Sequence, residues 1–556
     1  MTHDLVPYRP KNKVRVVTAT SLFDGHDAAI NIMRRILQDS GAEVIHLGHN
    51  RSVSEIVEAA IQEDAQAIAV SCYQGGHMEF FKYIVDLLRE KGAPHIKVFG
   101  GGGGVIIPPE IRELQEYGVT RIYSPEDGRS LGLQGMINDL LQTIDRPYNV
   151  KEVLDRIGDL SVDNYLTVAK VITAIELAKA GEDGYLPGLR AKLEERRRKT
   201  VPTLGVTGPG GSGKSSLVDE LVNRFLNDFE DKSVGILSVD PSRRKTGGAL
   251  LGDRIRFNSI SRERVYLRSL ATRESNLEIS AALEESVLAL RAAGFDLIIV
   301  ETAGIGQGNA AVAPLVDLTL YVMTSEYGAA SQLEKIDMLD FADVVTINKF
   351  DRKGSEDALR DVRKQYQRNR KLFDRSPAEM PVYGTIAARF NDDGVNALYL
   401  AVLEVIAQKT GVVFKSSLPR PEGRHSSSKT IIIPPERTRY LAEIAQTVRD
   451  YHEWVEAQAE TAERLWRIDG ALAELDPEPE KDGLRQALQN KRAELAACLE
   501  AEAAGRLEEF PRLKEMYAAE EFVSQVRAKE FRTPMSQESL AGTRIPRVAL
   551  PEYRNP

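Results

Sequence analysis

A histidine and a carboxylate near the N-terminus are residues of the types that form a transition-metal site. His26 lies two residues after Asp24, in the segment Asp24-Gly25-His26. One imidazole nitrogen can bind a transition metal, and the other can then donate a hydrogen bond. A carboxylate at Asp24 can accept that bond, which sets the tautomer and raises the basicity of the ligand. An isolated pair of this kind is more often a helix N-cap beside a surface histidine, so the assignment needs further elements.

Two later segments contain the small residues that would complete such a site. Ser71-Cys72-Tyr73 follows one apolar run, and the glycines Gly100 to Gly104 follow the next. Glycines permit close approach of a ligand to the backbone. We expect Ser71 to close a long slot between a sheet and a helix, and Gly100 and Gly101 to form its floor. All three loops follow strands of one parallel sheet, so they should meet at one rim.

A second group of residues has the pattern of a phosphate-binding loop. Gly208-Pro-Gly-Gly-Ser-Gly213-Lys214-Ser215 lies between an apolar strand and a helical pattern, which is the context that a P-loop requires. Backbone N–H groups and the start of the helix would hold the phosphates. Lys214 would contact the β- and γ-phosphates, and the Ser215 hydroxyl would bind magnesium. The residues expected in this loop are Gly208, Gly210, Gly211, Ser212, Gly213, Lys214, Ser215 and Ser216.

A base-reading segment and several acids follow this loop. In Asn348-Lys349-Phe350-Asp351, the carboxylate of Asp351 can accept two hydrogen bonds from guanine, which adenine does not offer. Each such bond is worth about 1.5–3 kcal/mol, so GTP is preferred over ATP. Glu301 ends an apolar strand, where it would organise magnesium through water, and Gly304 would sense the γ-phosphate. Asp240 and Asp253 add acids around a glycine-rich loop that could order around magnesium and be released after hydrolysis.

The elements that must position these residues alternate between apolar runs and amphipathic segments. Runs at 14–18, 43–47, 67–70, 96–99 and 121–123 predict a five-stranded parallel sheet with a flavodoxin-like strand order. A second alternating region predicts another parallel sheet, and an Ala-, Glu- and Leu-rich region predicts helices. The expected parts are an α/β domain at 1–148, a helical linker at 149–200, a P-loop domain at 201–415, a flexible linker at 416–437, a helical region at 438–530 and an extended tail at 531–556.

Composition excludes several classes of protein. The 556 residues include 73 basic and 82 acidic side chains, a net charge of −9, which argues against nonspecific nucleic-acid binding. No apolar stretch reaches the roughly 18 residues that a membrane span needs. The two cysteines, Cys72 and Cys498, are far apart, and the start of the chain has no apolar signal core. A cytoplasmic protein without membrane contact is therefore expected.

The N-terminal residues resemble the cobalamin-binding domain of adenosylcobalamin-dependent acyl-CoA mutases. The resemblance covers residues 13–145 and rests on Asp24, His26, Ser71 and the Gly100-Gly101 pair. It implies that His26 binds the cobalt of adenosylcobalamin and that the slot takes the displaced nucleotide tail. The sequence departs from the pattern at Ala29, where the family has glycine.

Residues 201–415 are similar to the G-protein chaperones that escort acyl-CoA mutases. The similarity rests on GPGGSGKS, VDPS, TGG, LGD, ETAGIGQ and NKFD together. It implies that Lys214, Ser215, Asp240, Asp253, Glu301 and Asp351 bind GTP or GDP and Mg²⁺. Lys214, Asp240, Asp253 and Glu301 would be the catalytic set. Gln332 and Lys335 are candidates for a further switch that contacts the cobalamin domain, although a solvated helix face explains them equally well.

The order of the parts resembles that of the fused isobutyryl-CoA mutases over the whole chain. In that family an acyl-CoA-binding TIM barrel follows the helical region, whereas this sequence stops at Pro556. The barrel is therefore expected as a continuation of the chain or as a separate subunit. The resemblance implies a homodimer in which GTP hydrolysis gates cofactor loading and repair, and, with the barrel, interconversion of isobutyryl-CoA and n-butyryl-CoA.

Two other functions remain open from the residues alone. The chain could be a cobalamin-sensing or delivery GTPase without a mutase partner. It could instead be a P-loop small-molecule kinase in which the histidine domain is only a scaffold, although NKFD disfavours ATP.

Overall fold

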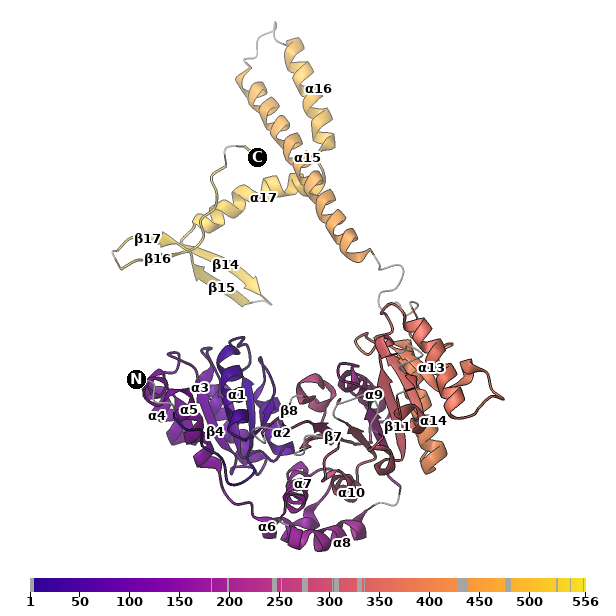
Figure 1. Cartoon of the computed structure of the whole chain (residues 1–556). Coiled ribbons are helices and arrows are strands. Elements are labelled where there is room, and N and C mark those ends of the chain that lie inside the picture. The colour runs from indigo at the N-terminus through magenta and orange to yellow at the C-terminus, as the bar shows by residue number, and fades with distance from the viewer. Residues whose placement is uncertain are drawn as a thin grey trace. The chain divides into compact units, whose positions relative to one another are not determined.

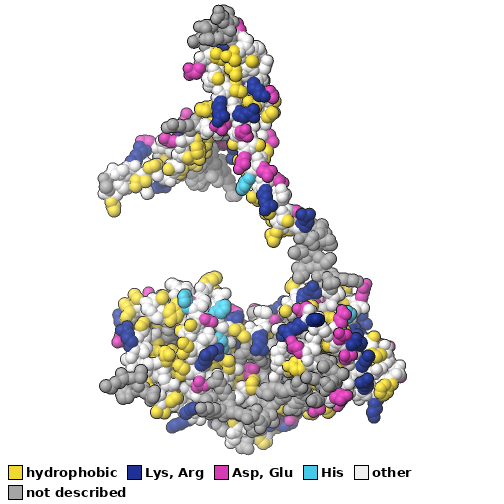
Figure 2. Space-filling model, turned by 45° about the horizontal axis from the view of Figure 1, so that its top comes forward, with side chains coloured by type: hydrophobic (Ala, Val, Ile, Leu, Met, Phe, Trp, Pro, Cys, Tyr) yellow, Lys and Arg dark blue, Asp and Glu magenta, His cyan; other side chains and the backbone are white. Residues whose placement is uncertain are grey.

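The computed structural model describes two units, residues 1–430 and 431–556. It describes residues 5–556 except 182, 198–199, 243–247, 252, 273–278, 303, 305–309, 328–332, 335, 428–438, 476–481, 527–528, 541 and 554. Figure 1 shows two sheets flanked by helices in the first unit and mainly helices in the second. Within the described part of the chain, no helix combines the length and the apolar character needed to cross a membrane. On the face drawn in Figure 2, acidic and basic side chains are interspersed.

The N-terminal domain is a parallel sheet with helices on both faces. Its own strands are β1 (Arg15–Thr20), β2 (Glu43–His46), β3 (Ala67–Ser71), β4 (Lys97–Gly101) and β5 (Arg121–Tyr123). Its helices are α1 (Ala28–Asp39), α2 (Val53–Gln62), α3 (His77–Glu90), α4 (Pro108–Tyr117) and α5 (Pro125–Ile144). The order β5-β4-β3-β1-β2 is flavodoxin-like, as the alternation of apolar and amphipathic segments predicted.

The two faces of this sheet bury different apolar clusters. On one face Ile56, Phe81 and Ile84 of α2 and α3 pack on Val17 and Ile68. On the other, Leu37 of α1 and Ile137 and Leu140 of α5 pack near Val16 and Phe99. Because side chains alternate along a strand, neighbouring residues serve opposite clusters. This alternation explains why the strands contain near-continuous apolar runs.

The helical linker leads into a second parallel sheet. The linker contains α6 (Val150–Asp155), η1 (Ile157–Asp159), α7 (Tyr165–Lys179), η2 (Asp183–Tyr185) and α8 (Leu186–Arg196). The strands of the second sheet run in the order β13-β12-β11-β6-β10-β7-β9. Their bounds are β6 (Thr203–Thr207), β7 (Val234–Asp240), β9 (Val265–Ala271), β10 (Leu297–Glu301), β11 (Leu318–Met323), β12 (Val344–Asn348) and β13 (Val382–Thr385). This arrangement confirms the predicted parallel sheet of a P-loop domain and adds β9 and β13, which the sequence patterns missed.

The helices of the second domain lie between these strands along the chain, except α14, which follows the last strand. They are α9 (Lys214–Asp228), α10 (Leu283–Ala293), α12 (Met338–Phe341), α13 (Ser355–Asn369) and α14 (Asp393–Thr410), with short 3₁₀ helices η3 (Asp253–Arg256), η4 (Ser259–Ser261), η5 (Ala313–Leu315), η6 (Ser325–Tyr327) and η7 (Pro377–Glu379). Leu217, Leu221 and Phe225 of α9 pack in one core with Leu398 and Val402 of α14.

One strand does not belong to the sheet of its own domain. Residues Ala249–Leu251 form β8, which pairs in parallel with β2 and becomes the sixth strand of the N-terminal sheet. Ala249 and Leu251 are fully buried in the core of that sheet. Ala249–Leu251 are therefore a strand and not part of a loop as expected, because their main chain completes the edge of another sheet. Thr246 and Gly247 lie outside the described residues.

The segment expected to be a flexible linker, 416–437, is anchored over its described part. Ser416 and Ser417 donate hydrogen bonds to Asp228 of α9. Further along, the Ser426 hydroxyl donates to Asp392, and Gly384 of β13 bridges to His425. Residues 416–427 are thus held against the P-loop domain, and 428–437 lie outside the described residues.

The second unit pairs two long helices. These are α15 (Tyr440–Glu474) and α16 (Asp482–Cys498), followed by α17 (Ala501–Ala518). The antiparallel strands β14 (Glu521–Val526) and β15 (Lys529–Pro534) pair with each other, as do β16 (Ser536–Glu538) and β17 (Arg544–Pro546). Trp454 and Gln458 of α15 donate hydrogen bonds to Glu500 and to the Cys498 carbonyl near the end of α16. The predicted helical pair is present. The predicted helical region to 530 is wrong at its end, where β14 is a strand, and the predicted extended tail contains the pair β16 and β17.

Gly248 offers a test of how β8 is attached. An added Cβ at Gly248 would overlap the carbonyl oxygen of Gln38 and lie 2.9 Å from that of Ala42, both in the N-terminal domain. We expect Gly248→Ala to destabilise the protein by about 1–3 kcal/mol, since overpacking shifts the backbone. Urea unfolding and hydrogen exchange of the Ala249–Leu251 amides would measure this. Gly188→Ala, where a Cβ meets open space, should have little effect; equal stability of both variants would contradict the packing described.

Candidate functional site

The histidine loop follows β1 and is organised by the buried carboxylate of Asp24. Asp24 Oδ1 accepts hydrogen bonds from the backbone N–H of His26 at 2.9 Å and lies 2.7 Å from His26 Nδ1. Its Oδ2 accepts from the backbone N–H of Tyr73, in the loop after β3. The Asp24 side chain is 1% exposed, whereas that of His26 is 76% exposed. One carboxylate therefore joins two loops and orients an imidazole whose Nε2 remains available to a ligand.

The same hydrogen bonds determine the charge of Asp24. Burial acts to raise the pKa of this carboxyl, but the backbone N–H groups of Tyr73 and His26 and the His26 ring outweigh it and lower the pKa. Asp24 is therefore an anion at neutral pH. An anionic acceptor at Nδ1 favours the tautomer with hydrogen on Nδ1, which leaves a lone pair on Nε2.

Beside this loop, an apolar slot of about 270 Å³ opens between the sheet, α1 and α5. Ser71 on β3 and Gly101 on β4 are register partners, so two small residues lie side by side on the face that lines it. A Cβ on Gly101 would meet only the Tyr123 carbonyl oxygen, at 3.5 Å. Helix α5 is interrupted at Gly132, next to the lining residue Leu133. These features fit the predicted slot for a long, largely flat ligand part.

Gly100 lines the slot, as does Gly101, and its lack of a side chain also serves the opposite face of the sheet. A Cβ on Gly100 would overlap Phe81 of α3 and lie 2.7 Å from Ile122 Cδ1, on the opposite face of the sheet from the slot. Gly102 is likewise required, because a Cβ there would overlap the Cys72 carbonyl oxygen. Both glycines of the predicted pair therefore line the slot: an added Cβ on Gly101 would lie on the slot side, whereas the missing Cβ of Gly100 allows α3 to approach the other face of the sheet.

The phosphate-binding loop has the backbone shape of an anion cradle. Gly208, Gly211 and Gly213 have φ of 150°, 78° and 89°, which disfavour residues with a Cβ. A Cβ on Gly208 would overlap the Val322 carbonyl oxygen. Lys214 is buried and its Nζ donates to the carbonyl oxygens of Gly208 and Pro209 at 3.0 and 3.3 Å. The loop thus places an ammonium and the N-terminus of α9 in one concavity.

Buried polar groups in this loop fit a nucleotide with magnesium. The Ser215 hydroxyl donates to Glu301 Oε1 at 2.7 Å, and Glu301 is 1% exposed at the end of β10. The Ser212 hydroxyl is buried without a hydrogen-bond partner among the described atoms. Asp240 is buried at the end of β7, which lies beside β10. Several polar groups at the ends of neighbouring strands thus surround the place where phosphates and a cation would bind.

The predicted base-reading segment lies directly against the phosphate loop. Asn348 Nδ2 donates to the Ser212 carbonyl oxygen at 2.9 Å, and Lys349 Nζ donates to that of Gly211 at 2.7 Å. Asn348 Oδ1 accepts from the Ala387 backbone at 3.1 Å, so the residues just after β13 back this segment. Asp351 is exposed, so its side chain is accessible to a ligand from solution. Ser216, also in the predicted set, is exposed on the first turn of α9.

The remaining predicted residues are placed in part. A Cβ on Gly304 would lie 2.7 Å from Lys214 Nζ, and one on Gly210 would lie 3.0 Å from the Gly304 carbonyl oxygen, so both glycines border the phosphate loop. The side chain of Asp253 lies outside the described residues, as do Gln307, Gln332 and Lys335. Across the described residues, no three His, Cys, Asp or Glu side chains are grouped as a metal site.

Two contacts in the candidate sites were not predicted from the sequence. Arg256 Nη1 lies 3.5 Å from the Ser215 hydroxyl, and the Tyr73 backbone holds Asp24. Arg256 lies shortly after the LGD segment on which the resemblance rests, and that proximity was the available signal in the sequence. A backbone amide leaves no signal of its own, since every residue except proline has one.

The slot yields a direct test. In Gly101→Leu the new side chain would project into the slot, and we expect affinity for adenosylcobalamin to fall by roughly tenfold or more, because each 1.4 kcal/mol lost is tenfold. Equilibrium titration followed by visible absorbance would measure it. Gly158→Leu, at a position where a Cβ meets open space, is the control. Unchanged affinity in Gly101→Leu would exclude the slot as the binding site.

Two family profiles match the chain. That described as "Methylmalonyl Co-A mutase-associated GTPase MeaB" matches residues 168–465, and that of the B12 binding domain matches residues 14–127. The first therefore covers more than half of the chain and includes the phosphate loop and the base-reading segment. The second includes the histidine loop and the part of the slot that the sheet and α1 line.

Curated relatives align along nearly the whole chain. The fused isobutyryl-CoA mutase of Geobacillus kaustophilus is 56% identical over 551 residues, which are 99% of this chain and 50% of that protein. The proteins of the same name from Cupriavidus metallidurans and Nocardia farcinica are 53% and 52% identical over 558 and 554 residues, again 99% of this chain and 50% of theirs. The chain thus spans about half the length of the curated relatives it matches.

Proposed function

The chain belongs to the family of methylmalonyl-CoA mutase-associated GTPases, MeaB, joined to a B12-binding domain, and we propose that it hydrolyses GTP to control cofactor loading and repair of an acyl-CoA mutase. The observation that carries the proposal is that an oriented imidazole with an apolar slot and a complete phosphate loop occur in one compact unit. The curated relatives of the same order are named fused isobutyryl-CoA mutases.

In the N-terminal domain, His26 would hold adenosylcobalamin through Nε2 while Asp24 keeps Nδ1 protonated. When bound, this cofactor supplies a cobalt–carbon bond that can be cleaved to start radical chemistry. The slot lined by Ser71 and Gly101 would take the nucleotide tail, and Ala29, which also lines it, adds one methyl group where the family pattern has glycine. Asp24 stays anionic and buried, so it holds the ring without competing for the metal.

In the GTPase domain, the chain's own residues would position GTP and screen its charge. Lys214 and the N-terminus of α9 neutralise developing negative charge on the phosphates. Ser215 would bind Mg²⁺ directly, and Glu301, Asp240 and Asp253 would hold it through water or directly. Asn348 and Lys349 brace the phosphate loop, and Asp351 would read guanine. GTP and GDP would thus differ in the contacts they offer to the segments around Ser215 and Glu301.

The activity of the complete protein is proposed from its relatives. With a mutase barrel, on the same polypeptide or a separate subunit, it would interconvert isobutyryl-CoA and n-butyryl-CoA. We propose that the complete protein is a homodimer. A GTP-dependent shift in cobalamin affinity would then separate loading of intact cofactor from release of damaged cofactor.

Substitution of the histidine tests the cobalamin assignment. In His26→Ala the imidazole ligand is lost, so the visible spectrum of bound cobalamin should change to that of a form without a histidine ligand, and affinity should fall. Absorbance spectroscopy of the purified, cobalamin-titrated protein checks this. His49→Ala removes an exposed histidine of the same domain and should leave the spectrum unchanged. An imidazole-type spectrum in His26→Ala would refute the assignment.

Lys214→Ala tests the phosphate site. We expect GTP turnover to fall roughly 10²–10³-fold, as when one donor to a developing anion is removed. Cobalamin affinity without nucleotide should change little, since Lys214 lies in the other domain. Phosphate release assays measure turnover, and Lys232→Ala, a lysine on the surface of the same domain, is the matched control. Wild-type turnover in Lys214→Ala would rule out this loop as the hydrolytic site.

Asp351→Asn tests base recognition. Loss of the carboxylate should weaken GTP binding by roughly tenfold or more, since a hydrogen bond to a charged group is worth about 1.5–3 kcal/mol. Xanthosine triphosphate should bind more tightly than it does to the wild type, because the new amide can donate a hydrogen bond to the second carbonyl of xanthine. Competition with a fluorescent guanine nucleotide would measure both effects, with Asp357→Asn on the exposed face of α13 as control. An unaltered purine preference would mean that another group reads the base.

A further inference from the structure

A short segment of the GTPase domain is built into the cobalamin domain. Strand β8 pairs with β2 through only three register pairs, Glu43 with Ala249, Val44 with Leu250 and Ile45 with Leu251. In comparison, β1 and β3 share five pairs in the same sheet. Ile255, just after β8, contacts Gly48 in the loop after β2. A Cβ added to Gly48 would lie 2.7 Å from Ile255 Cδ1. β8 is thus an edge strand with few pairs, and it and the residues after it contact the N-terminal domain directly.

A buried ionic contact secures the residues after β8 to the cobalamin domain. Arg254 is 3% exposed and its Nη2 donates to Gln62 Oε1 at 2.6 Å, at the end of α2. Its Nη1 donates to the Leu267 carbonyl oxygen at 3.0 Å and lies 3.5 Å from Glu63 Oε1. Burial lowers the pKa of Arg254, and Glu63 opposes that shift. A guanidinium this deep depends on these acceptors, since an unpaired buried charge is strongly unfavourable.

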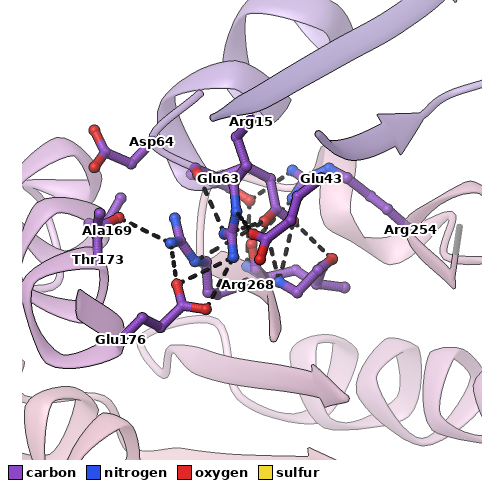
Figure 3. A network of polar contacts seen from close by, with 12 residues as sticks. Arg15, Glu43, Glu63, Asp64, Ala169, Thr173, Glu176, Arg254 and Arg268 are labelled. Atoms are coloured by element: carbon purple, nitrogen blue, oxygen red, sulfur yellow. Dashed lines mark hydrogen bonds and ion pairs between the residues drawn. The ribbon is translucent and has the colours of Figure 1, made fainter. Parts of the chain in front are cut away.

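Arg254 is one member of a larger buried network, drawn in Figure 3. Glu63 also accepts from Ser269 of β9 and lies 3.3 Å from Arg15 of β1. Glu176 of the linker helix α7 pairs with Arg15 at 3.0 Å and with Arg268 of β9 at 2.6 Å. These contacts fix the cobalamin domain, the linker and β9 to one another, whereas Arg254 is the member that comes from the short segment after β8.

The other end of this segment contacts the phosphate-binding helix. Arg256 Nη1 lies 3.5 Å from the Ser215 hydroxyl, the predicted magnesium ligand. One turn later on α9, Asp219 accepts hydrogen bonds from the backbone of Asn258 and Ser259 at 3.0 and 2.8 Å. The described residues of this segment, 249–251 and 253–259, therefore contact an edge of the cobalamin sheet at one end and, at the other, the first two turns of the helix that begins at the phosphate loop.

We propose that residues 249–259 are the coupling element of this protein, in which β8 changes its pairing with β2 when the nucleotide changes and Arg254 transmits that change to α2. The inference rests on the proposed function, because it assigns the regulation of the two proposed sites. Nucleotide exchange moves Ser215 and Arg256, and because Arg256 belongs to η3, η3 shifts with them. The chain connects η3 to β8, and Arg254 of η3 contacts Gln62 and Glu63. The strand next to β2 is β1, and the loop after β1 contains Asp24 and His26.

Coupling between two binding sites is reciprocal, so the experiment can measure it from either ligand. The factor by which a GTP analogue changes cobalamin affinity must equal the factor by which cobalamin changes affinity for that analogue. We would determine the affinity of the 556-residue chain for adenosylcobalamin with GDP and with a non-hydrolysable GTP analogue, and the converse. We expect a factor of roughly 5–150 in wild type, the usual range for linked sites.

Arg254 variants test the link. In Arg254→Ala the factor should fall toward one while GTP turnover and cobalamin binding without nucleotide are retained, because Arg254 contacts neither proposed site. Arg254→Lys keeps the positive charge but loses the paired N–H donors of the guanidinium, so it should restore the coupling factor in part. Arg262→Ala, which removes a hydrogen bond to Asn227 within the GTPase domain, should leave the factor at its wild-type value.

A reversible crosslink addresses movement of β8 without disturbing the buried charges. Val44→Cys with Leu250→Cys places two thiols at register partners, in a Cys498→Ser background that removes the exposed native thiol. The oxidised form should lose the nucleotide effect on cobalamin affinity, and reductant should restore it, which separates a locked strand from a misfolded protein.

The outcomes distinguish failure of the proposed gating function from failure of the coupling element alone. A wild-type chain whose cobalamin affinity is the same with GDP and with the GTP analogue would overturn the gating function, and the coupling element with it. A wild type that responds, together with Arg254→Ala and an oxidised crosslink that respond equally, would overturn the coupling element alone. Loss of the response in both variants, with recovery on reduction, would support it.

Discussion

The buried carboxylate of Glu63 holds together the parts on which both sites depend. It is fully buried at the end of α2 and accepts hydrogen bonds from the backbone and the hydroxyl of Ser269 of β9. Two buried arginines, Arg15 and Arg254, pair with it from opposite domains. Removing one partner from such a group typically costs about 3–5 kcal/mol, because the remaining charges are left without compensation. The two domains are therefore joined through α2 as one unit rather than tethered by a linker alone.

A second constraint is the absence of side-chain atoms where ligands must approach. At the slot, Ser71 and Gly101 are register partners and leave the sheet surface open. At the phosphate loop, Gly208 and Gly213 have positive φ and border the Val322 carbonyl oxygen and the Asn348 side chain. Both sites lie beyond the carboxyl ends of parallel strands, where ligands bind in open α/β sheets. The same architecture is thus used twice, once for a flat apolar ligand part and once for an anion.

The attachment of β8 gives this pair of sites a physical connection. A GTPase alone needs its nucleotide-sensing segment only to contact phosphate and magnesium. Here the segment also completes a sheet whose first strand leads into the histidine loop, and its buried arginine contacts α2. Edge strands with few pairs exchange partners at low cost, so the connection can respond to a ligand without unfolding either domain.

The sequence by itself determined the chemistry of the sites and the class of the fold. Asp24-Gly25-His26, the phosphate loop and the NKFD segment each follow an apolar run, and local rules of strand, loop and helix suffice to place them at strand ends. Only the tertiary structure decided what the missing side chain of each glycine at the slot makes room for. Gly100 and Gly101 are adjacent in sequence but face opposite sides of the sheet, and Phe81 is what requires the first. Likewise β8 is a three-residue run whose partner β2 is some 200 residues away, and Arg254 finds its acceptors on α2. Such long-range pairing depends on the packing of whole domains, and no local pattern of residues encodes it.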